Sequence, residues 1–151
     1  MPAPCLARVD CRFPPGETQE TLVELISRQA DAWSARDRPP GLDCHIYVAE
    51  FDTFNGRHFA VPEYAAAWLT PIESPIVTAA LSGLTAAGLP AQTATYGFCT
   101  NGSLTAGLRS VPTIGYGIGR EQEAHTVDEY IELTNLYRGT IGYSAIVGAL
   151  L

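Results

Sequence analysis

The sequence contains no lysine, and its basic side chains are nine scattered arginines set against 16 acidic residues. The formal net charge is −7 at pH 7, so the chain lacks the basic stripe that a nucleic-acid partner needs. No apolar run approaches the roughly 20 residues of a membrane span. The first residues also lack the basic segment and apolar core of a secretory signal. We therefore expect a cytoplasmic protein that binds neither nucleic acid nor membrane.

Cysteine is sparse and its spacing carries no metal motif. The four cysteines are Cys5, Cys11, Cys44 and Cys99, and none forms a C-x-x-C pair. In a cytoplasmic chain such cysteines are expected to be reduced thiols, and their spacing does not favour a zinc knuckle. Hydrophobic residues make up 46% of the chain and charged residues 17%, which predicts a folded domain rather than a disordered one.

The amino-terminal third predicts a strand–helix–strand unit. Apolar and polar residues alternate over 5–12, which is typical of a strand with one buried face. Thr18 is a candidate cap for a helix that runs to about Trp33. Residues 44–49 predict a second strand, and residues 52–71, which are interrupted by proline and glycine, predict a connection.

The rest of the chain predicts alternating helices and strands. A helix is expected between a cap at Ser74, with Pro75 at its first position, and a stop at Gly88. Its expected apolar stripe consists of Ile76, Val77, Ala80, Leu81, Leu84 and Ala87.

Two short strands are expected over 93–99 and 111–115, with a short helix near 104–108 between them. The last helix is expected over 134–150. Its expected inner face consists of Leu136, Thr140, Ile141, Ser144, Val147 and Leu151. Such alternation favours a layered α/β domain with a largely parallel sheet.

Several segments in order resemble the acetylornithine deacetylase, succinyl-diaminopimelate desuccinylase and glutamate carboxypeptidase family of zinc metallohydrolases. They are F-C-T-N-G-S at 98–103, V-P-T-I-G-Y-G at 111–117 and A-H-T-V-D-E-Y at 124–130. Near the start, V-D-C-R at 9–12 followed by P-G-E-T at 15–18 resembles the strand-to-helix junction of the lid, or dimerisation, domain in that family. The resemblance covers nearly the whole chain. It implies a β-α-β half of a ferredoxin-like lid, or dimerisation, domain in residues 1–57. It further implies the carboxy-terminal segment of the catalytic α/β domain in residues 58–151.

The resemblance implies a role for one histidine. Enzymes of this family use two zinc ions to activate a water that attacks an amide carbonyl, and the histidine of their A-H-T motif binds zinc. This histidine corresponds to His125, and an imidazole nitrogen is a normal zinc donor. On the residues alone, a surface loop histidine that makes a hydrogen bond is the alternative.

Substrate-binding residues are also implied by the resemblance. The turn after Cys99 is similar to the loop that receives a substrate carboxylate, although a plain helix cap is the alternative. The arginine after Asn55-Gly56 resembles one that reaches from the lid to the substrate, although a solvated loop arginine is the alternative. The implied residues are Thr100, Asn101, Gly102, Ser103, Arg57 and Gly117.

The chain lacks the family's other metal-binding motifs, since it contains neither H-x-D nor a Glu-Glu pair. We therefore expect a weak partial zinc site, no catalytic residue of its own, and no efficient hydrolysis by this chain alone. The intact enzyme would hydrolyse an N-acyl amino acid or a small peptide-like amide, with a homodimer forming through the lid. The alternatives are a split enzyme completed by an upstream chain, an interaction remnant that uses the lid's strand edge, and a truncation that barely folds.

Overall fold

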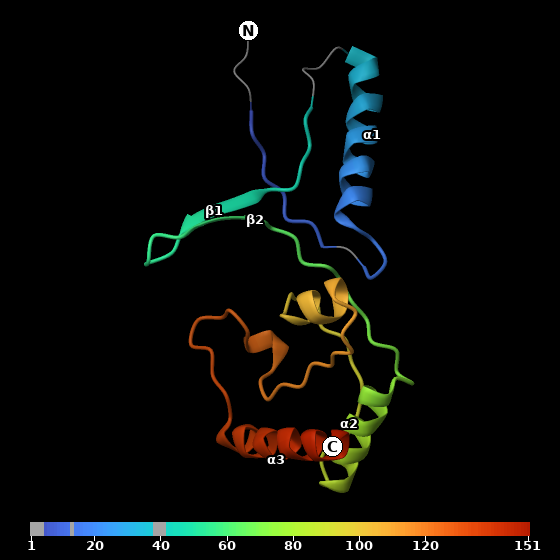
Figure 1. Cartoon of the computed structure of the whole chain (residues 1–151), viewed down its shortest axis with the longest axis vertical. Helices are drawn as coiled ribbons and strands as arrows, with labels where there is room; N and C mark the ends of the chain where they lie inside the picture. Colours follow the sequence, from blue (N-terminus) through green and yellow to red (C-terminus); the bar gives the residue numbers. More distant parts are fainter. Residues whose placement is uncertain (1–4, 13, 38–41) are drawn as a thin grey trace. The chain divides into compact units, whose positions relative to one another are not determined.

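The structure is a computed structural model that describes residues 5–12, 14–37 and 42–151. The chain forms two compact units, Met1–Trp68 and Leu69–Leu151, whereas the predicted domain boundary lay after Arg57. In these ranges, helices and one small antiparallel sheet make a broadly α/β composition (Figure 1). Within the described ranges, no helix is long and apolar enough to cross a membrane.

The first helix confirms its prediction. Helix α1 covers Gln19–Asp37, directly after the expected cap at Thr18. The Thr21 N–H donates to the Thr18 hydroxyl at 3.4 Å, and the Thr18 N–H donates to the Thr21 hydroxyl at 3.0 Å. This exchange resembles a capping box in which a threonine takes the place of the usual glutamate. The helix start is therefore fixed by its own first turn.

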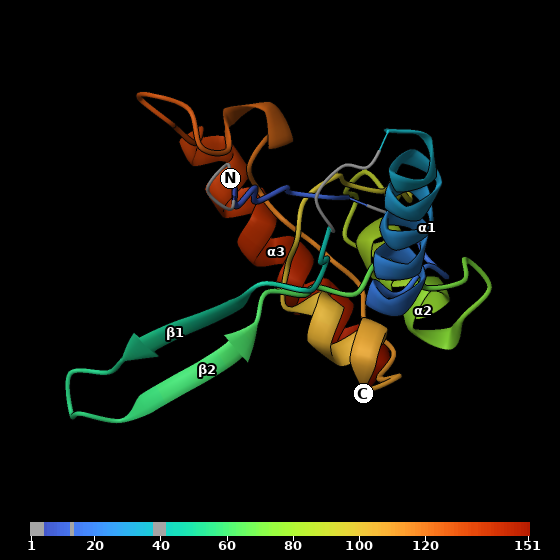
Figure 2. The same ribbon diagram turned by 90° about the horizontal axis from the view of Figure 1, so that it is seen from above.

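The sheet of the first unit is a hairpin. Strands β1 (Val48–Asp52) and β2 (His58–Pro62) pair antiparallel in the register from Val48↔Pro62 to Asp52↔His58 (Figure 2). Gly56 has φ +76° in the turn, and its N–H donates to the carbonyl of Thr53 at 2.9 Å. Glycine favours this turn because it adopts positive φ without a steric penalty, whereas Asn55 does not have positive φ here.

The hairpin corrects two predictions. The strand expected over 44–49 begins only at Val48, and β2 lies in the stretch that was expected to be a connection. The two strands are joined by a tight turn and pair with each other, so the expected β-α-β arrangement does not form among the described residues. A hairpin closes a short loop, whereas a parallel pair needs a long crossover connection.

The strand predicted over 5–12 is also wrong, since these residues have no regular secondary structure. Side chains rather than backbone pairing attach this segment to the hairpin. The Arg8 guanidinium carbon lies 3.9 Å from the centre of the Tyr47 ring, and the same group pairs with the Glu63 carboxylate. An alternating pattern alone does not make a strand, because a strand needs a neighbour that accepts its hydrogen bonds.

Two helices build the second unit. Helix α2 covers Pro75–Ala86 after an N-cap at Ser74, as predicted. Gly88 has φ +69°, and the Leu89 N–H donates to the carbonyl of Leu84 at 2.9 Å, which is the hydrogen-bond pattern of a glycine-ended helix. Helix α3 covers Leu133–Leu150 and confirms the predicted last helix. The hydroxyl of Ser74 is buried without a hydrogen-bond partner, so it does not cap α2 through its side chain.

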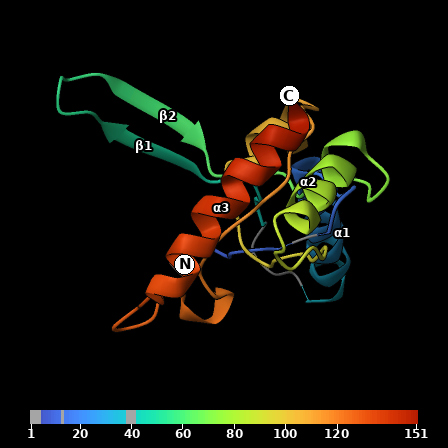
Figure 3. The ribbon, with the colours of Figure 1, turned by 90° about the horizontal axis from the view of Figure 1, so that it is seen from below.

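Helices α2 and α3 cross at small residues (Figure 3). A Cβ atom on Gly83 would lie 2.4 Å from the backbone oxygen of Ala145, so the two backbones approach closely there. Ala80, Leu84 and Ile146 form the buried cluster at this crossing. The core therefore lies along one side of α3 where the side chains are small.

The predicted inner face of α3 is wrong. Leu136, Ile141 and Val147 are 46%, 51% and 55% exposed, whereas the buried residues are Gly139, Gly142 and Ile146. The sequence pattern favoured the larger apolar residues. In the structure the side chains of Ile118 and Tyr116 lie against Gly139 and Gly142 instead, because glycine leaves the space that they fill. The buried stripe of α2 is partly as predicted, and it contains Val77, Ala80, Gly83 and Leu84.

The strands predicted over 93–99 and 111–115 are absent as well, and no parallel sheet forms in the ranges the structure describes. The short helix between them is present as a π-helix, Ser103–Leu108. The second segment is attached through side chains: the hydroxyl of Thr113 donates to that of Thr105 at 2.8 Å. Ile114 and Tyr116 pack on the helical core. These residues thus bury apolar surface without a neighbouring strand.

Candidate functional site

The predicted metal ligand lies in a loop whose two ends are paired. The loop leaves the extended segment at Arg120, passes through a 3₁₀ turn at Glu121–Glu123, and enters α3 after Glu132. The Arg120 guanidinium donates to the Glu132 carboxylate at 2.9 Å, across 12 positions of sequence. Compact loops with paired ends of this kind are common at functional sites. Both partners were missed in the sequence, where their only signal is opposite charge on either side of the loop.

His125 has an unusual backbone conformation within this loop. Its φ is +63°, and that of Asp128 is +61°; few residues other than glycine adopt this left-handed region. The His125 N–H donates to the Glu129 carboxylate at 3.3 Å. The Thr126 N–H and hydroxyl both donate to the carbonyl of Glu123, at 3.3 and 2.8 Å. The histidine itself is exposed, so its ring is accessible from solvent.

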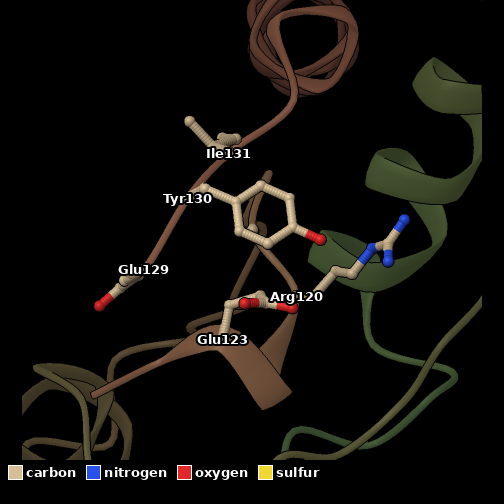
Figure 4. A pocket seen from close by; sticks show the side chains of 6 residues that line it. Arg120, Glu123, Glu129, Tyr130 and Ile131 are labelled. Carbon is tan, nitrogen blue, oxygen red and sulfur yellow. The ribbon is translucent and has the colours of Figure 1, made fainter. Parts of the chain in front are cut away.

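An open hollow of about 520 Å³ lies beside this loop. In Figure 4 the Tyr130 ring projects between Ile131 and Glu123, and the carboxylate of Glu129 points away from that ring. The hollow is lined by Gly119, Arg120, Glu123, Glu129, Tyr130 and Ile131. Two of these residues, Glu123 and Glu129, are the ones that hydrogen-bond to the backbone around His125.

The described part of the chain does not bring three or more metal-binding side chains together. No group of three or more His, Cys, Asp or Glu residues there could hold a metal ion. His58, which was expected in a loop, lies in β2 with its Nδ1 2.9 Å from Asp52 Oδ1. His45, which was expected in a strand, lies before β1 with Nδ1 3.8 Å from Asp43 Oδ2. Both assignments are corrected, because the strand pairing begins later in the chain than predicted.

The predicted carboxylate-binding turn is held by Thr100. The Gly102 N–H donates to the Thr100 hydroxyl at 3.2 Å, and the Ser103 N–H to its carbonyl at 3.0 Å. The Thr100 hydroxyl also lies 3.1 Å from the Tyr96 hydroxyl. The Thr100 side chain therefore holds this turn, while the short helix that follows begins without a side-chain cap.

The remaining predicted substrate residues are Gly117 and Arg57. Gly117 is open, since a Cβ atom there would meet nothing within 4 Å. It stands between Tyr116 and Ile118, which lie against α3. Arg57 belongs to the first unit, where its N–H donates to the Thr53 hydroxyl at 3.1 Å as part of the hairpin turn. The structure thus places His125, Gly117 and the turn at 100–103 in one unit and Arg57 in the other.

Comparison of the sequence with protein-family models and with curated proteins gave no match. The metallohydrolase resemblance therefore stays a prediction that rests on the sequence motifs.

Proposed function

We propose that this chain is the carboxy-terminal portion of a zinc-dependent amidohydrolase and contributes His125 as one metal ligand. The intact enzyme would hydrolyse an N-acyl amino acid or a small peptide-like amide. The observation that carries the proposal is the loop from Arg120 to Glu132, which holds the exposed His125 in a left-handed backbone conformation. Non-glycine residues in such conformations cost about 1–3 kcal/mol, and they cluster at functional sites.

Zinc suits the site because an imidazole is a normal donor for this ion. When bound, the metal would supply an activated water and polarise the amide carbonyl. His125 is one donor, and a catalytic zinc needs about three from protein. The other ligands and the general base must then come from another polypeptide segment, either of the same protein or of a companion chain.

The exposed apolar surface of α3 favours a further protein segment that packs over the second unit. Leu133 and Tyr137 are each 72% exposed, and Ile141 is 51% exposed. Extended exposed apolar surface usually marks a contact with protein or membrane. Because α3 begins soon after His125, a segment that covers its first turns, at Leu133 and Tyr137, would also lie near the His125 loop. We propose that the covering segment is the part of the catalytic domain that carries the other zinc ligands.

A zinc titration of the purified chain tests the metal role. We expect the imidazole resonances of His125 to shift at lower zinc concentration than those of His45 and His58, and we expect weak overall affinity. His125→Ala should abolish the first response, whereas His45→Ala should leave it intact. Equal responses at all three histidines would contradict the proposal. Tight stoichiometric zinc, or hydrolysis of an N-acyl amino acid by this chain alone, would contradict the proposed incompleteness of the site.

A second candidate is self-association through the hairpin. Both strands are largely exposed, and the Phe51 and Phe59 rings stack at 5.7 Å while remaining 50% and 41% exposed. An unpaired strand edge is a template for another strand, and a second copy of the chain would offer the same edge. Val61→Lys should then weaken a dimer measured by analytical ultracentrifugation, whereas Val9→Lys, outside the hairpin, should not. A monomer at all concentrations would rule this out.

A further inference from the structure

The His125 loop carries constraints of two different kinds. The Arg120–Glu132 pair at 2.9 Å joins its two ends, and the bonds from Thr126 to the Glu123 carbonyl tighten its first turn. The Thr126 N–H belongs to the peptide group that follows His125. The peptide group that precedes His125 is held by the bond from the His125 N–H to the Glu129 carboxylate, at 3.3 Å.

We propose that Glu129 is a positioning residue for His125. Its carboxylate accepts the His125 N–H and so selects the left-handed backbone conformation from which the imidazole is presented. This inference rests on the proposed metal role of His125 and adds to it the residue that sets the ligand's geometry.

Glu129 is expected to act by raising the fraction of molecules in which His125 has the left-handed conformation. A residue other than glycine leaves the left-handed region unless the surrounding structure holds it there. Without an acceptor for its N–H, His125 would spend part of its time in other conformations. The apparent affinity for a ligand falls by the fraction of molecules that are competent to bind. Removing a residue that orients a metal-binding histidine typically lowers metal affinity 10–100-fold. We expect a loss of about tenfold here, because Glu129 contacts the backbone of His125 and not its ring.

Three variants distinguish the acceptor role of Glu129 from the effect of its charge and from an effect on folding. Glu129→Ala removes the acceptor, whereas Glu129→Gln keeps an amide oxygen in its place. Asp128→Asn is the matched control, because it also removes one negative charge from the loop and asparagine tolerates the left-handed backbone. Asp128 has φ +61°.

The first readout is hydrogen exchange of the His125 amide in the metal-free chain. Glu129→Ala should speed this exchange about tenfold, whereas Glu129→Gln and Asp128→Asn should stay close to the parent chain. The thermal unfolding transition should be unchanged in all three, since the loop is exposed. Equal exchange rates in Glu129→Ala and Asp128→Asn would overturn the positioning role, whatever the metal does.

The second readout is a titration with Zn²⁺ alone, followed at the imidazole of His125, with His45 and His58 as internal references. Glu129→Ala should raise the apparent dissociation constant at His125 about tenfold, and Glu129→Gln should restore most of the affinity. If Glu129→Ala speeds amide exchange but leaves zinc affinity unchanged, positioning of the metal ligand is refuted. If the parent chain shows no zinc response at His125 at all, the proposed metal function fails, while the exchange result still decides what Glu129 does to the backbone.

Discussion

Replacing Gly83 with alanine is expected to destabilise the second unit, because the backbone of α3 lies directly against Gly83 of α2. A Cβ atom there would lie 2.4 Å from the Ala145 oxygen and 3.0 Å from the Ala149 Cβ. Ordinary contact begins near 3.4 Å, and the nearest atom belongs to the backbone, so the helices themselves must separate. Separation loosens the buried cluster at the crossing, which includes Leu84 and Ile146.

Two opposing effects decide whether Gly83→Ala raises or lowers the free energy of unfolding. Alanine is favoured over glycine inside a helix by about 1 kcal/mol. Overpacking of a closely packed site costs about 1–3 kcal/mol. We therefore expect Gly83→Ala to lower the free energy of unfolding by about 1 kcal/mol net, and by up to about 2 kcal/mol if α3 cannot move.

Gly148 provides the matched control, since it lies in α3 with nothing within 4 Å of a Cβ atom. Gly148→Ala should stabilise the unit by about 0.5–1 kcal/mol. Urea unfolding followed by far-ultraviolet circular dichroism measures both variants, and the difference between them isolates the packing cost. If Gly83→Ala stabilised the protein as much as Gly148→Ala, the two helices would not cross at this glycine and the packing argument would be refuted.

Three further substitutions test local features. Gly56→Ala should weaken the hairpin by about 1 kcal/mol, measured by cross-strand nuclear Overhauser effects, because Gly56 has φ +76°. Ser74→Ala should be close to neutral in urea unfolding, in contrast to the usual loss of about 1 kcal/mol at an N-cap, because the Ser74 hydroxyl is buried without a partner. The Thr18 side chain lowers the pKa of Glu20 below its ordinary 4.5; the resulting contribution to stability is present above the unfolded-state pKa and is lost as the pH falls through the lower folded-state pKa. Thr18→Ala should raise the pKa of Glu20 in a carboxylate NMR titration, and an unchanged pKa would exclude Thr18 as the cause.

The start of α1 and both ends of α2 could be predicted because neighbouring residues set them. The Thr18 hydroxyl reaches the third residue after it, Pro75 occupies the first position of α2, and Gly88 supplies a positive φ after its end. Each of these signals acts within about one helical turn, so no knowledge of the rest of the fold is needed.

The strands could not be predicted with the same success. The alternating pattern over 5–12 is that of a strand, yet Arg8 attaches the segment through the Tyr47 ring and the Glu63 carboxylate. Conversely, β2 was overlooked although Asn55-Gly56 signals a hairpin turn. Strands depend on which backbone lies alongside, and an alternating pattern does not identify that partner.

For the candidate site, too, the sequence located one part and the folded structure added the rest. The motif around His125 located a loop before the last helix, and the structure has a loop there. The contacts that shape it, from Arg120 to Glu132 and from the His125 N–H to Glu129, became visible only in the folded chain. The motif therefore identified the histidine, whereas the Arg120–Glu132 pair that joins the ends of its loop had no signal beyond opposite charge.

By itself, the sequence determined where α1 begins and where α2 begins and ends, because capping and proline or glycine geometry act between neighbours in the chain. Tertiary structure alone decided which side of α3 is buried and which strands pair. Gly139 and Gly142 are buried while Leu136 and Ile141 are exposed, because a helix turns toward its neighbour the side that allows the closest approach. That choice depends on the shape of the neighbouring segment, which no periodicity within α3 records.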